Sequence, residues 1–272
     1  AIPMNWMRPL GTTGLQVSAL GLGTVKLGRD RGVKYPRPFT IPDDRSAAAL
    51  LALARDLGIN LLDTAPAYGT SEERLGRLLR GQRREWVICS KVGEEFEAGV
   101  SRFDFTPEHT RRSVQRSLER LQTDVLDIVL VHSNGDDLGI IRDMGTLQAL
   151  AALKGEGLIR AYGMSTKTIG GGLAAAAACD LVMVTYNPAE RQALPVLDAC
   201  ARLPRGVLVK KPLASGHLPP GNNDPVQASM DLVLAHPGTS AAIVGTICGA
   251  HLRSDAGAAR LALSRRSPAG SC

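Results

Sequence analysis

Aromatic residues are scarce in this chain, where they make up 4 % of 272 residues. Proteins that bind single-stranded nucleic acids stack the bases on platforms of aromatic side chains, and too few are present here. The formal net charge of +6 is mildly basic, but its arginines are spread over many segments, such as 83–84, 111–112 and 265–266. That spread is typical of solvated helix faces, so the sequence predicts no nucleic-acid partner.

Cysteines are few and scattered. None of the five stands in a CxxC pair or at the spacing of a metal finger. The sequence therefore predicts neither a disulfide framework nor a zinc site, and no metal site is expected. Free, mostly packed thiols are expected at Cys89, Cys179, Cys200, Cys248 and Cys272.

Long apolar runs are absent as well. No stretch of the sequence is apolar over the length needed to cross a bilayer, and the first residues do not show the charged-then-apolar pattern of a secretory signal. We therefore expect no membrane association, and a cytoplasmic location as the default.

Short β-like apolar runs alternate with helix-like segments along the whole chain. Such alternation favours parallel strands joined by crossover helices, and eight repeats favour a closed (β/α)8 TIM barrel over an open sheet. The length suits one barrel, so a single domain over 1–272 is expected. The predicted strands are 18–25, 60–65, 87–91, 125–132, 159–164, 181–186, 206–210 and 240–245.

Two of the intervening segments carry clear helix signals. Thr106, Pro107 and Glu108 supply a cap, a first-turn proline and an early acid. The segment from Pro42 has an apolar stripe and ends at Gly58, which is placed as a helix terminator.

Ionisable residues stand where three of the predicted strands end. Asp63 and Tyr68 lie at the end of the second strand and in the turn after it, Lys91 ends the third and His132 ends the fourth. Because barrel enzymes gather their active groups at the carboxyl ends of the strands, these four residues are predicted to meet. Taken singly, they have plainer interpretations as a turn cap, a rim phenol, an exposed amine and a packed histidine.

Together the four side chains suit proton transfer to a carbonyl oxygen. A phenol titrates near 10, so it donates a proton well at neutral pH only if its anion is stabilised. Lys91 supplies that positive charge, Asp63 keeps the buried amine charged, and His132 hydrogen-bonds a substrate oxygen. The set has no good nucleophile and no metal-ligand spacing, so another group would deliver a hydride.

The segment DTAPAYG at 63–69, with Leu75 and Gly76 after it, resembles the signature of the aldo-keto reductase family. The opening segment 8–24 is similar to that family's hairpin, which plugs the barrel bottom, and to its first strand. The resemblance covers nearly the whole chain. It implies a catalytic tetrad of Asp63, Tyr68, Lys91 and His132, with Tyr68 as general acid and His132 orienting the carbonyl.

The resemblance also implies an extended NADPH, with NADH possible, bound without a Rossmann fold. The implied cofactor-binding residues are Gly23, Thr24, Ser165, Thr166, Lys210, Leu213, Gly245, Thr246, His251 and Asp255. Three positions depart from the family pattern: Thr166 stands where asparagine is usual, Met183 where glutamine is usual, and Lys210 where a tyrosine normally stacks on nicotinamide. Lys210 is equally consistent with an exposed strand end and with a pyrophosphate contact.

The choice of cofactor and substrate stays open. His251 and Gly245 stand where NADPH-preferring members often have arginine and lysine, which leaves a slight preference for NADPH on family habit. A short segment after His132 indicates an open site for a small aldehyde or ketone. Two alternatives remain: a nicotinamide-binding regulatory protein on the same barrel, and a lyase in which Lys91 forms a Schiff base. The oligomeric state is not indicated.

Overall fold

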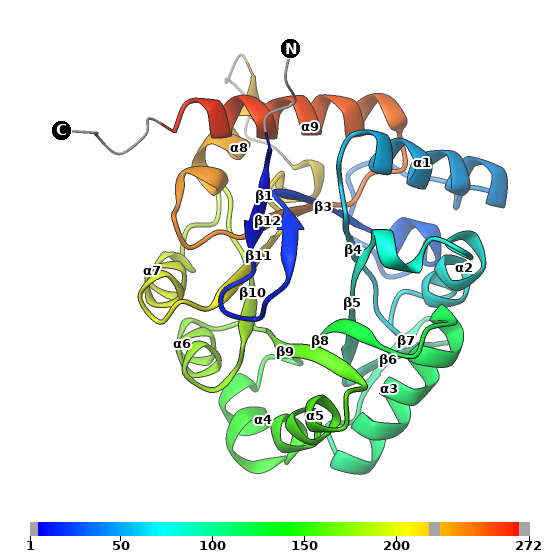
Figure 1. The fold of residues 1–272 in the computed structure, drawn as a ribbon, viewed down its shortest axis with the longest axis vertical. Helices are drawn as coiled ribbons and strands as arrows, with labels where there is room; N and C mark the ends of the chain where they lie inside the picture. Colours follow the sequence, from blue (N-terminus) through cyan, green and yellow to red (C-terminus); the bar gives the residue numbers. More distant parts are fainter. Residues whose placement is uncertain (1–4, 218–223, 267–272) are drawn as a thin grey trace.

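Within residues 5–217 and 224–266, which the computed structural model describes, eight parallel strands close into a barrel with helices around it (Figure 1). All eight predicted strands are present. They follow one another around the barrel as β3 (Leu20–Gly23), β4 (Leu61–Asp63), β5 (Val87–Val92), β8 (Leu126–His132), β9 (Ile159–Ser165), β10 (Leu181–Thr185), β11 (Gly206–Lys210) and β12 (Ala241–Val244). Strand β12 pairs with β3 and completes the ring.

Each barrel strand is followed by at least one helix, which returns the chain along the outside of the barrel (Figure 1). The helices are α1 (Asp44–Asp56), α2 (Ser71–Leu78), α3 (Pro107–Leu121), α4 (Asp137–Asp143), α5 (Thr146–Gly155), α6 (Ile169–Ala178), α7 (Leu194–Arg202), α8 (Pro225–Ala235) and α9 (Gly249–Ser264). Short 3-10 turns are η1 (Val25–Leu27), η2 (Arg83–Glu85) and η3 (Ala214–Gly216).

The predicted helix signals act as expected. The Thr106 hydroxyl accepts a hydrogen bond from the backbone N–H of His109 and caps α3, with Pro107 in its first turn. Helix α1 ends at Asp56, and Gly58 follows it with φ of +85°. A left-handed residue just past a helix end is the usual place for glycine, because other residues strain there.

The strands separate two apolar layers. Leu61, Cys89 and Ile128 point into the barrel, where they pack together in one cluster. Their neighbours Leu62 and Ile88 point outward and pack with the helices in a second cluster. This alternation follows from the two-residue period of a strand, so a single run of apolar residues fills both layers.

A hairpin closes the amino-terminal end of the barrel, as the resemblance implied. It pairs β1 (Met7–Pro9) with β2 (Gln16–Ser18), and in Figure 1 it lies in blue across the front of the ring. Leu10, Leu15 and Val17 pack against the interior residues of the barrel strands. The apolar plug seals this end, which leaves the opposite end for a ligand.

A second hairpin, formed by β6 (Glu94–Glu97) and β7 (Val100–Phe103), was not predicted. Five of its eight strand residues are exposed and four are charged, so the alternation of apolar and polar residues that reveals a half-buried strand is missing. The two turn residues, Ala98 and Gly99, have φ of +51° and +79°. Both values are positive, as a tight hairpin turn requires.

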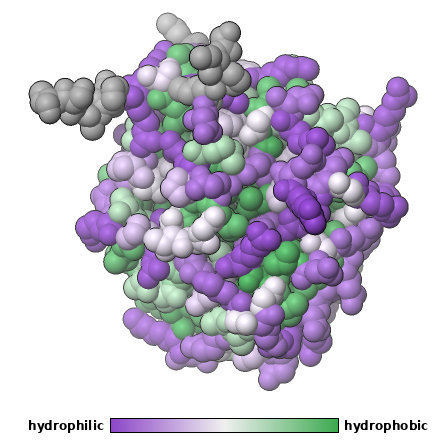
Figure 2. Space-filling model, in the orientation of Figure 1, coloured by the Kyte–Doolittle hydropathy of each residue, from purple (hydrophilic) through white to green (hydrophobic). Residues whose placement is uncertain are grey.

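The plugged face shows no single stripe of charge. Figure 2 shows hydrophilic side chains spread over most of this face, with apolar residues between them. In the part of the chain that the structure describes, no helix is both long and apolar enough to cross a membrane.

Close backbone contact between β9 and β10 depends on Gly163. A Cβ atom at this position would lie 2.0 Å from the Leu181 carbonyl oxygen, which belongs to the neighbouring strand. We therefore expect Gly163→Ala to lower the free energy of unfolding by at least about 2 kcal/mol. Chemical denaturation measures the change. Gly170→Ala is the matched control, because no atom lies within 4 Å of its Cβ position and alanine favours the helix. Equal stability of the two variants would contradict the prediction.

Candidate active site

The four ionisable residues meet at the carboxyl ends of neighbouring strands, opposite the plug. Strands β4, β5 and β8 are adjacent in the barrel, and they carry Asp63, Lys91 and His132. Tyr68 lies in the turn after β4, which begins with a hydrogen bond from the Tyr68 N–H to the Ala65 carbonyl. The sequence brings these groups together because each ionisable residue lies at or next to the carboxyl end of its apolar strand, and these ends are neighbours in the barrel.

Lys91 and Asp63 form a buried ion pair. The Lys91 Nζ donates to Asp63 Oδ1 at 2.6 Å and to the Thr64 carbonyl at 2.9 Å. Their side chains are 1 % and 7 % exposed, so water does not solvate either charge. Burial opposes the charge of Lys91, but the negative charge of Asp63 counters it, and the pKa of the amine is raised. Lys91 is therefore a fixed ammonium group.

Tyr68 lies against this ammonium. Lys91 Nζ is 4.8 Å from the centroid of the Tyr68 ring. Burial raises the pKa of the phenol, and the positive charge of Lys91 works against that rise. The phenol is protonated at neutral pH, with a cation 4.8 Å from the centre of its ring.

His132 faces Tyr68 edge to face, with 6.1 Å between the ring centroids. Burial lowers the pKa of His132, as do the surrounding positive charges, of which Lys91 is the first. Sequence analysis missed its neighbour Glu94, whose Oε2 is 3.0 Å from His132 Nδ1. A glutamate two residues beyond a strand end in a charged segment gives no signal of this contact.

A layer of buried polar groups supports the strand ends. Thr24 donates its hydroxyl proton to the Asp63 carbonyl at 2.8 Å and lies 2.7 Å from the Ser71 hydroxyl. The hydroxyl of Thr24, a predicted cofactor residue, is thus already used within the protein. On the other side, Asp137 accepts hydrogen bonds from the backbone N–H groups of Lys167 and Thr168. This buried carboxylate ties the loop after β8 to the loop after β9.

The predicted nicotinamide-side residues also converge. Ser165 ends β9 beside His132 in the strand register, and Thr166 follows it, buried. Lys210 ends β11, and its Nζ donates to Ser165 Oγ at 2.8 Å. Burial lowers the pKa of Lys210 to about 8, with help from the positive charge of Lys211.

The remaining predicted cofactor residues lie around the same end of the barrel. Gly23 ends β3, Leu213 precedes η3, and Gly245 and Thr246 follow β12. His251 is exposed in the first turn of α9, whereas Asp255, one turn further along the helix, is buried.

Two observations show that this side fits an extended anionic cofactor. A Cβ at Gly245 would meet only the Tyr35 hydroxyl, 3.8 Å away, so the backbone there is open to a ligand. Helix α9 has Cys248 at its N-cap, and the Cys248 side chain accepts no hydrogen bond from the first turn. Free N–H groups at a helix start bind phosphate well.

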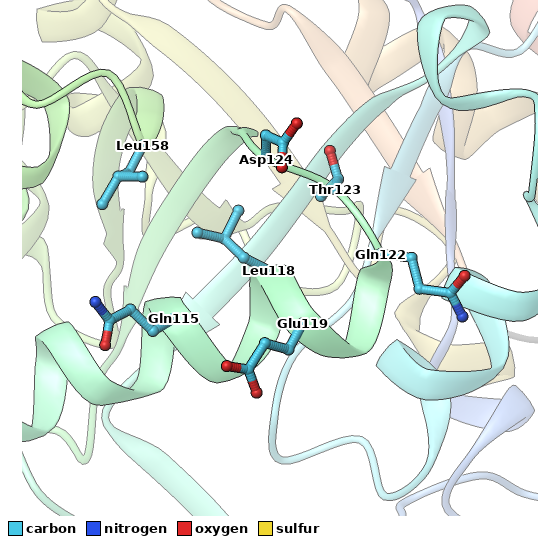
Figure 3. Close-up of a pocket in the computed structure, with 7 residues that line it drawn as sticks. All are labelled: Gln115, Leu118, Glu119, Gln122, Thr123, Asp124 and Leu158. Carbon is cyan, nitrogen blue, oxygen red and sulfur yellow. The ribbon is translucent and has the colours of Figure 1, made fainter.

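A surface hollow lies elsewhere and is not part of this site. Figure 3 shows it beside the end of α3, lined by Leu118, Gln122 and Thr123 and reaching Leu158. These residues stand before β8 and β9 begin, so the hollow is at the plugged end of the strands.

Comparison with known proteins identifies the family. The aldo/keto reductase family model matches residues 19–263. The chain belongs to the aldo-keto reductase family. The match confirms the membership that the sequence resemblance indicated. The members of this family are oxidoreductases.

Three similar proteins show how far the likeness extends. A structure from Pseudomonas aeruginosa assigned to the aldo-keto reductases is 60 % identical, with a TM-score of 0.87 over 94 % of this chain and 95 % of that one. The holo form of a Bacillus halodurans aldo-keto reductase is 25 % identical, with a TM-score of 0.78 over 97 % of each chain. D-threo-aldose 1-dehydrogenase of a Pseudomonas species is 31 % identical over 75 % of this chain and 68 % of its own length. The first curated relatives are matched over about half of their length, 48 %.

The buried carboxyl of Asp255 makes stability depend on pH. Burial raises its pKa from 3.8 to about 7, so the folded protein holds a proton that the unfolded chain has lost between these values. Stability therefore falls as pH rises through this window, and the loss is complete above about pH 7. We expect Asp255→Asn to stabilise the cofactor-free protein by about 1–3 kcal/mol at pH 8 and by little at pH 4.

Thermal unfolding at the two pH values measures this difference. Asp124→Asn, which removes an exposed acid, is the control. A gain of the same size at both pH values would contradict the assignment to Asp255.

Proposed function

We propose that this protein reduces an aldehyde or ketone to an alcohol with NAD(P)H, and that Tyr68 is the general acid. The single observation that carries the proposal is the placement of Lys91, which is buried between Asp63 and Tyr68 with its charge secured. A fixed cation beside a protonated phenol is what proton donation to a carbonyl oxygen needs.

The residues divide the work of the reaction. A bound nicotinamide cofactor supplies the hydride. Tyr68 gives its proton to the carbonyl oxygen, and Lys91 stabilises the phenolate that remains. Asp63 holds Lys91 in place by its 2.6 Å hydrogen bond. His132, on the adjoining strand end, hydrogen-bonds the carbonyl oxygen and orients it toward Tyr68.

The cofactor-binding roles follow the same geometry. Ser165 and Lys210 lie where the nicotinamide amide would bind, and the open backbone at Gly245 with the start of α9 suits the phosphates. His251 and Gly245 stand where NADPH-preferring members often have arginine and lysine, which weakens selection for a 2'-phosphate. The slight preference for NADPH rests on family habit. The family uses NAD(P)H in general, and NADH remains the second cofactor to test.

The substrate we propose is a small carbonyl compound. The loop after β8 is short, since α4 begins at Asp137, five residues beyond His132. A relative named for D-threo-aldose supports a sugar-like aldehyde or its cyclic form among the compounds to be tried.

The alternatives fit the site less well. A Schiff base needs an amine that loses its proton easily, whereas the charge of Asp63 raises the pKa of Lys91. A regulatory nicotinamide-binding protein has no use for a buried proton donor with its own cation. Turnover therefore separates this second candidate from the enzyme.

Replacing the Tyr68 hydroxyl tests the proposal. We expect Tyr68→Phe to lower kcat for carbonyl reduction by at least about 100-fold, because the proton donor is lost. Cofactor affinity is expected to change less than about twofold, which corresponds to well under 1 kcal/mol. Loss of nicotinamide absorbance with an aldehyde panel measures turnover, and fluorescence titration with NADPH and NADH measures binding.

Tyr162→Phe provides the control, because this partly buried tyrosine lies on β9 away from Lys91. Tight cofactor binding by wild type without turnover of any aldehyde would favour the regulatory protein. Full activity in Tyr68→Phe would refute the role of the phenol.

A further inference from the structure

Lys210 extends from the carboxyl end of β11 to that of β9. Its Nζ donates to Ser165 Oγ at 2.8 Å, so the side chain crosses β10, which lies between these two strands. Ser165 in turn pairs with His132 in the strand register, at the candidate active site. The amine therefore lies beside the hydroxyl group to which the proposed function assigns the nicotinamide amide.

The Lys210 amine has no acid of its own. Among the residues that the structure describes, no carboxylate lies at ion-pair distance from it, and its hydrogen-bond partner is the neutral Ser165 hydroxyl. Asp63 acts on the amine from beyond that distance, but this acid is already paired with Lys91. The Lys210 side chain is partly buried, so solvent screens its charge only in part. A ligand beside Ser165 would therefore meet a cation that the described residues leave unpaired.

Lys210 keeps its proton at neutral pH but loses it a little above. Burial lowers its pKa to about 8, and the positive charges of Lys211, of Lys91 on β5 and of Lys167 after β9 add to the effect. Asp63 works against the fall without cancelling it. The amine is therefore mostly charged at pH 7 and mostly neutral at pH 9.

The other shifted groups at these strand ends keep their charge state over the same range. The pKa values of Tyr68, Cys89 and Lys91 are raised, and the pKa of His132 is well below its usual value. Of these four groups and Lys210, it is Lys210 that changes charge between pH 7 and pH 9.

The two oxidation states of a nicotinamide cofactor differ by one positive charge. The oxidised ring is a cation and the reduced ring is neutral, whereas the adenosine and phosphate groups are the same in both. A cation beside the ring raises the free energy of the oxidised form and leaves that of the reduced form nearly unchanged. The tyrosine that the family resemblance implies at position 210 acts the other way, because the face of an aromatic ring attracts a cation.

We propose that Lys210 is a specificity-determining residue that makes the protein bind the reduced nicotinamide cofactor more tightly than the oxidised one. Its positive charge opposes binding of the oxidised ring at Ser165, so the oxidised cofactor left after carbonyl reduction dissociates more readily. The inference rests on the proposed function, since it requires a nicotinamide beside Ser165. A contact of Lys210 with the pyrophosphate, the other role open to this lysine, would strengthen the binding of both forms alike.

Separate titrations with NADPH and NADP⁺ test the proposal without turnover. Fluorescence gives the Kd of NADPH and calorimetry that of NADP⁺, and NADH with NAD⁺ covers the second cofactor. At pH 7 we expect the Kd of the oxidised form to be at least about tenfold higher in wild type, and at most about twofold higher in Lys210→Gln. Glutamine loses the charge but keeps a donor for Ser165. Lys211→Gln, which removes a charge from the exposed neighbouring residue, should change the ratio less than about twofold.

The pH dependence separates the charge of Lys210 from its size. Between pH 7 and pH 9 the wild-type ratio should fall toward that of Lys210→Gln, because deprotonation of the amine removes the repulsion and tightens NADP⁺ binding. In Lys210→Arg, which stays charged, the ratio should remain about tenfold at both pH values. Asp255 and the phosphates face the part that both forms share, so their titration cancels in the ratio.

Each contrary result has a distinct meaning. Equal affinity for the two forms in wild type, or a wild-type ratio that stays the same from pH 7 to pH 9, would overturn the role of Lys210. A parallel loss of affinity for both forms in Lys210→Gln would overturn it as well, in favour of a phosphate contact. Failure of every form to bind would refute the proposed function itself.

Discussion

The candidate site depends on keeping one lysine charged inside the protein. A buried ammonium is costly unless a counter-ion and further acceptors compensate for the lost water. Lys91 has both, since Asp63 Oδ1 and the Thr64 carbonyl accept its hydrogens at 2.6 and 2.9 Å. Both acceptors come from the end of β4, the strand paired with β5. The strand register of the barrel therefore fixes the charge on which Tyr68 depends.

The same charge shapes its neighbours in opposite ways. It opposes the rise in pKa that burial causes at Tyr68, and it adds to the fall that burial causes at His132. The result is a protonated phenol beside a neutral imidazole. Burial alone would also leave the phenol protonated and the imidazole neutral. In the reaction that we propose, Lys91 adds stabilisation of the phenolate, which forms only after proton transfer.

Sequence reasoning succeeded where a signal is local and periodic. Apolar runs ending in Asp63, Lys91 and His132 predicted the strands and their shared end, because strand direction alone places carboxyl ends together. It missed Glu94, because the β6–β7 hairpin is polar and exposed. Its turn residues determine this hairpin more than any apolar pattern does. The paired oxygens of Glu94 depend on Ser101 across the hairpin and on the close turn at Gly93, and these are tertiary contacts without a sequence signature.

The three departures at the cofactor side become connected once the strands are in place. Ser165, Met183 and Lys210 lie on consecutive strands β9, β10 and β11, and Met183 pairs with Ser165 in register. To reach Ser165 Oγ, Lys210 extends across β10, the strand that carries Met183. The Lys210 amine, which donates a hydrogen bond to Ser165, is a donor on the side where Met183 and Thr166 have no side-chain amide. Compared with the pattern that the family resemblance implies, positions 166 and 183 have no side-chain amide and position 210 has no aromatic ring, and Lys210 donates to Ser165 in their place.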